Sequence, residues 1–199
     1  MATAASRPVP ASASPAWRWR TRDIVVAAII GVVFGVVFQV WNAIWAATGG
    51  VFTFFPPAQN LFYGIWLVPA VLAPLIVRKP GAALFAELVA AGLSAVIGSQ
   101  FGPDAILSGL VQGGAAELVF LVTLYRMWSF PVLAAASIAS AAAAWVHDWI
   151  IWYPTNAVDF QIWVGICMAI SAVVITAGGS LMLVRSLRQA GALKGFPAG

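Results

Sequence analysis

The chain has 199 residues, of which 62% are hydrophobic and 8% are charged, and its net charge is +4. A soluble domain contains roughly 25% charged residues, so this composition excludes an ordinary soluble protein and indicates one that crosses the lipid bilayer several times. The positive charge does not indicate a nucleic-acid-binding protein, because the ten Lys and Arg residues lie at the ends of apolar segments.

Residues 1–22 are rich in Ala, Ser, Pro and Arg and contain no apolar block. This composition predicts a disordered cytosolic tail. It does not predict a signal peptide, because the apolar stretch that follows is too long and no small-residue cleavage site closes it.

Six apolar segments follow, each long enough to cross about 30 Å of hydrocarbon as a helix. Gly and Pro residues separate them, as helix ends require. The segments are Asp23–Ala47, Gln59–Val77, Gly81–Ser99, Asp104–Tyr125, Pro131–Trp152 and Asp159–Val184. The sequence therefore predicts an all-α fold, with a six-helix transmembrane domain over residues 23–187 and a cytosolic tail over residues 188–199.

The positions of the basic residues predict the orientation of these spans. Lys and Arg occur before the first span, in the second and fourth connections and after the sixth span, and in none of the other loops. By the positive-inside rule, both termini are then cytosolic, and the loops near residues 48–58, 99–103 and 153–158 face outward.

Three of the six acidic residues, Glu87, Glu117 and Asp148, lie inside apolar segments. Placing a charge at that depth costs at least about 2.5 to 3.5 kcal/mol, so each indicates a function. At 1.5 Å per residue, the two glutamates lie on the order of 10 to 14 Å from the cytosolic face, and Asp148 on the order of 25 Å. This predicts a cavity entered from outside, with Asp148 near its lip and the glutamates deeper.

The other acidic residues begin apolar segments, where a carboxylate satisfies free backbone N–H groups and complements the helix dipole. These residues are Asp23, Asp104 and Asp159.

No Lys or Arg lies at the depth of the interior acids, and His147 adjoins Asp148 in sequence, which on a helix points it about 100° away. A cationic or amino-bearing ligand is the simplest partner for these acids. A neutral or hydrogen-bonded clamp between helices is the alternative for each one.

Aromatic and amide residues gather where such a ligand needs them. Asn60, Tyr63 and Trp66 recur every three residues on the second span, and Gln39, Asn42 and Trp45 repeat the spacing on the first. Gln112 is a further interior amide. Rings stack on flat heterocycles and attract positive charge, and carboxylates accept hydrogen bonds from ring amino groups. Helix packing and an interfacial aromatic belt remain alternatives.

Small residues recur every four positions on the first span, at Ala27, Gly31 and Gly35. They form a flat stripe on which another membrane helix can lie closely. That helix can belong to this chain or to a partner subunit.

Four stretches, covering roughly residues 58–152, resemble the YkoE-type substrate-binding (S) components of energy-coupling factor (ECF) transporters. They read YGIW at 63–66, RKPGAALFAE at 78–87, GLVQGGAAE at 109–117 and HD at 147–148. The resemblance implies a six-helix protein of a prokaryotic plasma membrane. Such a protein captures thiamine or its hydroxymethylpyrimidine precursor from outside and docks on a transmembrane coupling subunit driven by two ATPase modules.

The matching stretches carry six candidate pocket residues, Tyr63, Trp66, Glu87, Gln112, Glu117 and Asp148. In S components generally, a small-residue stripe on the first helix meets the coupling subunit, and Ala27, Gly31 and Gly35 fit that role. The chain departs from the pattern just before Asp148, where an aromatic residue is expected and His147 stands.

The sequence contains no Walker A motif, no metal-ligand cluster and no nucleophile paired with a base, so no catalytic activity and no cofactor are predicted. A stand-alone, proton-coupled carrier or exporter of organic cations is the alternative function, since the same acids could bind protons. A membrane-embedded enzyme is disfavoured, because the single His and the single Cys, Cys167, lie in different spans.

Overall fold

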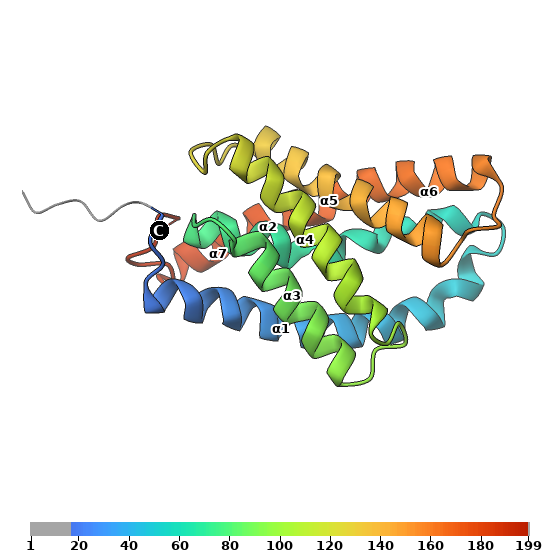
Figure 1. Cartoon of the computed structure of the whole chain (residues 1–199), viewed down its shortest axis with the longest axis horizontal. Coiled ribbons are helices and arrows are strands. Elements are labelled where there is room, and N and C mark those ends of the chain that lie inside the picture. The colour runs from blue at the N-terminus through green and yellow to red at the C-terminus, as the bar shows by residue number, and fades with distance from the viewer. Residues whose placement is uncertain (1–16, 199) are drawn as a thin grey trace, which may run out of the picture.

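The computed structural model describes residues 17–198, and all of its regular elements are helices (Figure 1). They are α1 (Thr21–Thr48), η1 (Gly49–Phe52), η2 (Pro56–Leu67), α2 (Val68–Val77), α3 (Ala82–Val96), α4 (Asp104–Val122), α5 (Phe130–Ile151), α6 (Val158–Ser171), η3 (Ala172–Gly178) and α7 (Gly179–Gln189). The elements η1 and η2 are 3₁₀ helices, and η3 is a π-helix.

Five continuous helical stretches of the described chain are long and apolar enough to cross a membrane. They are Thr21–Phe52, Pro56–Val77, Asp104–Val122, Phe130–Ile151 and Val158–Gln189. The predicted third span corresponds to α3, which is apolar but has 15 residues. The chain is therefore an all-α membrane protein in which five of the predicted spans meet the length of a transmembrane helix.

Of the predicted N-terminal tail, the structure describes residues 17–22, and residues 1–16 lie outside the described range. The Trp19 indole donates a hydrogen bond of 2.9 Å to the Pro80 carbonyl, and α1 begins at Thr21. Asp23 caps this helix as predicted, since its carboxylate accepts the Arg20 N–H at 3.0 Å.

The C-terminal segment also packs on the bundle. Leu193 and Ala198 are buried in the main hydrophobic cluster, and the Phe196 ring lies 5.1 Å below the Arg22 guanidinium. The beginning of α1 and the end of α7 lie at the same end of the molecule (Figure 1).

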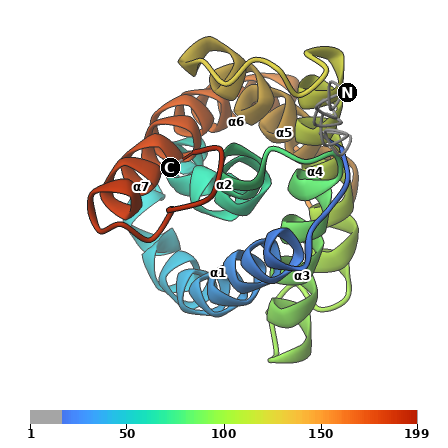
Figure 2. The same ribbon diagram turned by 90° about the vertical axis from the view of Figure 1, so that its left-hand side faces the viewer.

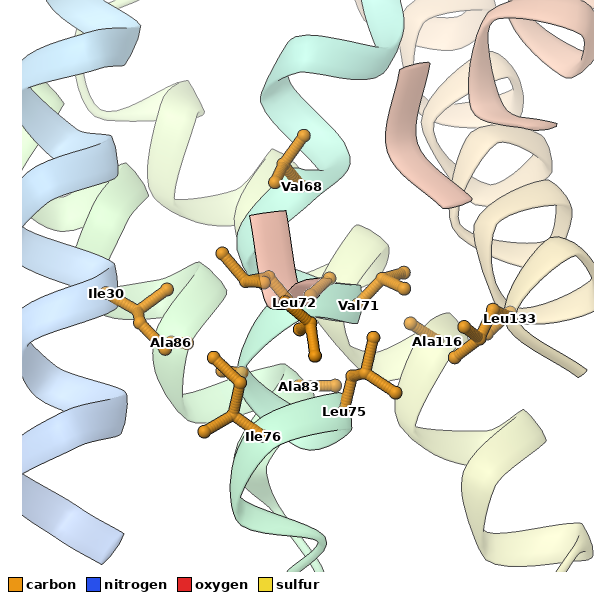
Figure 3. Packing of buried hydrophobic residues seen from close by; sticks show 14 of the residues in the cluster. Ile30, Val68, Val71, Leu72, Leu75, Ile76, Ala83, Ala86, Ala116 and Leu133 are labelled. Carbon is orange, nitrogen blue, oxygen red and sulfur yellow. The ribbon is translucent and has the colours of Figure 1, made fainter. Parts of the chain in front are cut away.

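Helix α2 forms the centre of the bundle, and the other helices surround it (Figure 2). All ten of its residues are buried, as expected for a helix that is apolar all round. Its side chains, among them Val71 and Leu75, pack between Ile30 of α1 and Leu133 of α5 (Figure 3). Because lipid is as apolar as these side chains, close packing rather than transfer from water stabilises the arrangement.

The small-residue stripe of α1 packs against α3 of the same chain. A Cβ atom at Gly31 would lie 2.6 Å from the Val89 Cβ, and one at Gly35 would lie 2.8 Å from the Leu93 Cβ. Ala27 is fully buried. The prediction that this stripe contacts a partner subunit is therefore corrected. A four-residue spacing shows that a helix lies close, but it does not show to which chain that helix belongs.

Replacing Gly31 by Val should lower the melting temperature of the detergent-solubilised protein, because overpacking of this kind costs about 1 to 3 kcal/mol. Gly92→Val is the matched control: Gly92 lies on α3, and nothing lies within 4 Å of a Cβ built there. Thermal unfolding followed by tryptophan fluorescence measures both. Equal melting temperatures for the two variants would contradict the α1–α3 contact.

The 3₁₀ helix η2 is fixed to the π-helical region of the last transmembrane stretch. The Gly64 N–H donates to Ser171 Oγ at 2.8 Å, and Thr176 Oγ1 donates to the Gly64 carbonyl at 2.8 Å. A Cβ atom at Gly64 would lie 2.7 Å from the Ser171 carbonyl oxygen, so only glycine permits this approach. The contact sets the position of the aromatic residues that η2 carries.

Candidate substrate-binding site

A cavity of about 150 Å³ lies in the half of the bundle away from the Lys and Arg residues of the described chain. The second half of α1, the middle and end of α3, the first half of α4, the 3₁₀ helix η2 and the end of α5 surround it. Its walls combine carboxylates, aromatic rings and amides. Of the predicted pocket residues, it brings together Asn60, Tyr63, Trp66, Glu87, Gln112 and Asp148.

Glu87 is the most deeply buried acid of the cavity, with 1% of its surface exposed. Its Oε2 accepts the Ala70 N–H at 3.0 Å, one of the N–H groups that the first turn of α2 leaves free. Gly113 of α4 allows the close approach, since a Cβ there would lie 2.9 Å from the Glu87 Cβ. The carboxylate is therefore held in one position while it lines the cavity.

Five aromatic rings form a continuous wall from α1 to the end of α5. The Trp45 and Trp66 ring centroids are 4.8 Å apart, and those of Tyr63 and Trp66 are 5.2 Å apart. Trp66 then contacts Phe101 at 6.0 Å, and Phe101 contacts Trp152 at 5.5 Å. All four contacts are edge-to-face, and the five residues all line the cavity.

Polar side chains hold this wall in place. The Trp66 indole donates to Asn42 Oδ1 at 3.0 Å, and Asn42 Nδ2 donates to Ser99 Oγ at 3.1 Å. Gln112 Nε2 donates to the Tyr63 hydroxyl at 3.3 Å. The amides therefore orient the rings, and both amides also line the cavity.

Asn60 is fixed by its own helix, because its Nδ2 donates to the Pro57 carbonyl at 3.2 Å. It is buried and lines the cavity beside Tyr63 and Trp66.

Two carboxylates and a histidine meet where α4 begins and α5 ends. His147 Nδ1 lies 2.9 Å from Asp148 Oδ1, and His147 Nε2 lies 3.1 Å from Asp104 Oδ1. The Trp152 indole donates to Asp104 Oδ2 at 2.9 Å. Burial and the Asp148 carboxylate raise the pKa of nearby Tyr153, which therefore contributes a neutral hydroxyl to the cavity.

Glu117 does not line the cavity, which corrects its predicted role. Its two carboxylate oxygens accept the N–H groups of Gly81 at 2.6 Å and Ala83 at 2.9 Å, so it caps the start of α3. The Tyr125 hydroxyl also donates to it, and burial together with the Glu117 carboxylate raises the pKa of Tyr125.

The helix that carries Glu117 also ends earlier than predicted. Helix α4 ends at Val122, and Leu124 and Tyr125 turn the chain with positive φ angles of 52° and 55°. Glu117 therefore lies only about 8 Å along the helix from this end. The prediction that both glutamates line the cavity therefore fails for Glu117. Its side chain faces the start of α3, whereas that of Glu87 faces the cavity.

The fold of the whole chain matches a solved structure described as a crystal structure of an S-component of ECF transporter. The TM-score is 0.85 and the sequence identity is 32%, and the match covers 90% of this chain and 91% of the other. The chain belongs to the S components of ECF transporters. S components are non-catalytic, substrate-binding subunits of transporters.

Two further comparisons agree that this S component belongs to a transport system. Residues 22–143 match a family described as ABC-type cobalt transport system, permease component. The chain is also 35% identical over 130 residues to the putative HMP/thiamine permease protein YkoE of Bacillus subtilis strain 168. That match covers 65% of this chain and 64% of the length of the relative.

Within residues 17–198, no group of three or more His, Cys, Asp or Glu side chains is placed to hold a metal ion. The Asp104 and Asp148 side chains each lie within hydrogen-bond distance of His147. Cys167 is buried and unpaired.

The sequence prediction missed Asp104 and Phe101 as cavity residues of this S component, whereas it placed Asn42 among the residues near the ligand. Asp104 was assigned to helix capping alone, because it begins an apolar segment. Its place directly after a loop that is predicted to face outward was the signal, since Asp104 lines the cavity. Asn42 shared the three-residue spacing of Trp45, whereas no pattern in the sequence pointed to Phe101.

Proposed function

We propose that this S component captures thiamine, or its hydroxymethylpyrimidine precursor, from outside the cell. The observation that supports this most strongly is the cavity itself, which combines a fixed, buried carboxylate, an aromatic wall and two further carboxylates. The name of the Bacillus subtilis relative adds support for this class of ligand.

The two acidic regions of the cavity suit the two halves of thiamine. Glu87 accepts hydrogen bonds from the amino group of the pyrimidine, and the rings of Tyr63 and Trp66 stack on its flat face. The permanently cationic thiazolium lies toward Asp104 and Asp148, where carboxylates and the Trp152 ring attract positive charge. Hydroxymethylpyrimidine occupies only the first of these regions.

The proposed topology has six spans, and both termini lie in the cytosol of a prokaryotic cell. Helix α3 is the third span and the shortest. The Lys and Arg residues support this topology, because each lies before or at the start of α1, in the α2–α3 or α4–α5 connection, or in α7 and the segment after it. In this orientation the cavity opens outward. The S component then delivers the ligand inward through a transmembrane coupling subunit, which two ATPase modules drive.

Titration of the purified protein in detergent with thiamine, hydroxymethylpyrimidine and Co²⁺ tests the ligand class. Trp45, Trp66 and Trp152 line the cavity, so thiamine should quench tryptophan fluorescence in a saturable way. Co²⁺ serves as the comparison because the matching family is described as a cobalt permease. Saturation by Co²⁺ without any response to either pyrimidine would overturn the proposal.

A proton-coupled carrier is the competing function, since His147 places a protonatable group beside the cavity. The S component reconstituted alone in liposomes should bind thiamine without accumulating it under a pH gradient. Accumulation without ATPase modules would favour the carrier.

A further inference from the structure

His147 is enclosed by carboxylates on both sides of its ring. Its Nδ1 faces Asp148 of the same helix at 2.9 Å, and its Nε2 faces Asp104 at the start of α4 at 3.1 Å. The His147 side chain is 6% exposed, whereas both carboxylates line the cavity. The histidine therefore acts on the cavity only through the two aspartates.

This geometry requires a proton. A neutral imidazole carries one N–H and one lone pair, so one of its nitrogens would set a lone pair against a carboxylate oxygen. Both contacts are favourable when both ring nitrogens carry hydrogen. The group of three side chains then holds a net charge of −1 rather than −2.

Within residues 17–198, the structure places no Lys or Arg side chain against the two aspartates. The groups that face them from the neighbouring elements are the hydroxyls of Tyr63 and Tyr153 and the indole N–H of Trp152. The nine Lys and Arg residues within residues 17–198 lie in segments at the other end of the bundle.

We propose that His147 is a positioning residue that stores one proton between Asp104 and Asp148, and that a cationic ligand displaces this proton when it binds. The inference rests on the proposed function, since it assumes that the thiazolium of thiamine lies at these carboxylates. The charges balance: a fixed cation enters, one proton leaves to water, and the net charge at the site stays −1.

The exchange separates the two candidate ligands. Thiamine carries the fixed cation and releases the proton, whereas hydroxymethylpyrimidine lacks it and leaves the proton in place. Proton release makes binding tighter as the pH rises, by up to about tenfold per pH unit wherever the free site is protonated and the bound site is not. Both ligands contain an aminopyrimidine, but the cationic thiazolium lowers the pKa of this ring in thiamine, so the protonation of each free ligand is measured separately and subtracted.

Isothermal titration calorimetry of the full chain, in two buffers with different ionisation enthalpies, counts the protons directly. Between about pH 6.5 and 8.5, near and above the ordinary pKa of histidine, thiamine should release close to one proton and hydroxymethylpyrimidine close to none. His147→Gln should bind thiamine with no proton release and a flat pH profile. Asp159→Asn, an exposed acid outside the cavity, should behave as the wild type.

Thiamine binding without proton release in the wild type would overturn this inference and leave the proposed function standing. Failure of both compounds to bind at every pH would overturn the proposed function and the inference together. The number of protons that the wild-type protein releases on thiamine binding tests the inference even if His147→Gln does not fold.

Discussion

Replacing Glu87 by Gln is expected to weaken thiamine binding by about 10- to 100-fold. A hydrogen bond to a charged partner contributes about 1.5 to 3 kcal/mol, and the amide keeps the size of the side chain while losing the charge. Hydroxymethylpyrimidine should lose affinity by a similar factor, because Glu87 is proposed to hold the ring that the two ligands share. Equilibrium titration by tryptophan fluorescence measures both constants.

Glu117→Gln is the matched control for this experiment. Glu117 is also a glutamate in a transmembrane helix, but it caps α3 and does not line the cavity. The variant should be less stable yet bind thiamine with unchanged affinity per folded molecule. Weaker binding by Glu117→Gln than by Glu87→Gln would reverse the assignment of the two glutamates.

Replacing Asp104 and Asp148 together by Asn should lower thiamine affinity by about 100-fold or more while changing hydroxymethylpyrimidine affinity only a few-fold. Coupling energies of about 1.5 to 7 kcal/mol have been measured for close charge pairs at interfaces, and the double variant removes both negative partners of the thiazolium. Calorimetry with both ligands provides the comparison.

Asp159→Asn should leave both constants unchanged, because Asp159 begins α6 and is exposed outside the cavity. An equal loss of affinity for the two ligands in the Asp104 and Asp148 double variant would show that the carboxylates support the pocket without contacting the cation.

Several cavity residues could be predicted from the sequence, because the spacing of the aromatic and amide residues matches the turn of the helix that carries them. Asn60, Tyr63 and Trp66 recur every three residues, and a 3₁₀ helix has three residues per turn, so the three side chains share one face of η2. An α-helix would have spread them over a wider arc. The prediction of a shared face was thus confirmed, and the type of helix explains why it holds so well.

Other features depended on the direction in which a side chain points and on which helices are neighbours, and the sequence alone does not show either. Glu87 and Glu117 looked equivalent, since both lie in apolar segments at similar depth, but one points into the cavity and the other at the beginning of α3. The stripe of Gly31 and Gly35 likewise indicated a close helix without identifying α3 as that helix. The contact of His147 with both Asp104 and Asp148 required α4 and α5 to be placed side by side.

The central claim is that thiamine binds in the cavity between the aromatic wall and the two acidic regions. An experimental structure of the S component with thiamine bound tests it most directly. We predict the aminopyrimidine within hydrogen-bond distance of Glu87 and the thiazolium beside Asp104 and Asp148. Thiamine bound outside this cavity, or turned so that the thiazolium meets Glu87, would contradict the account.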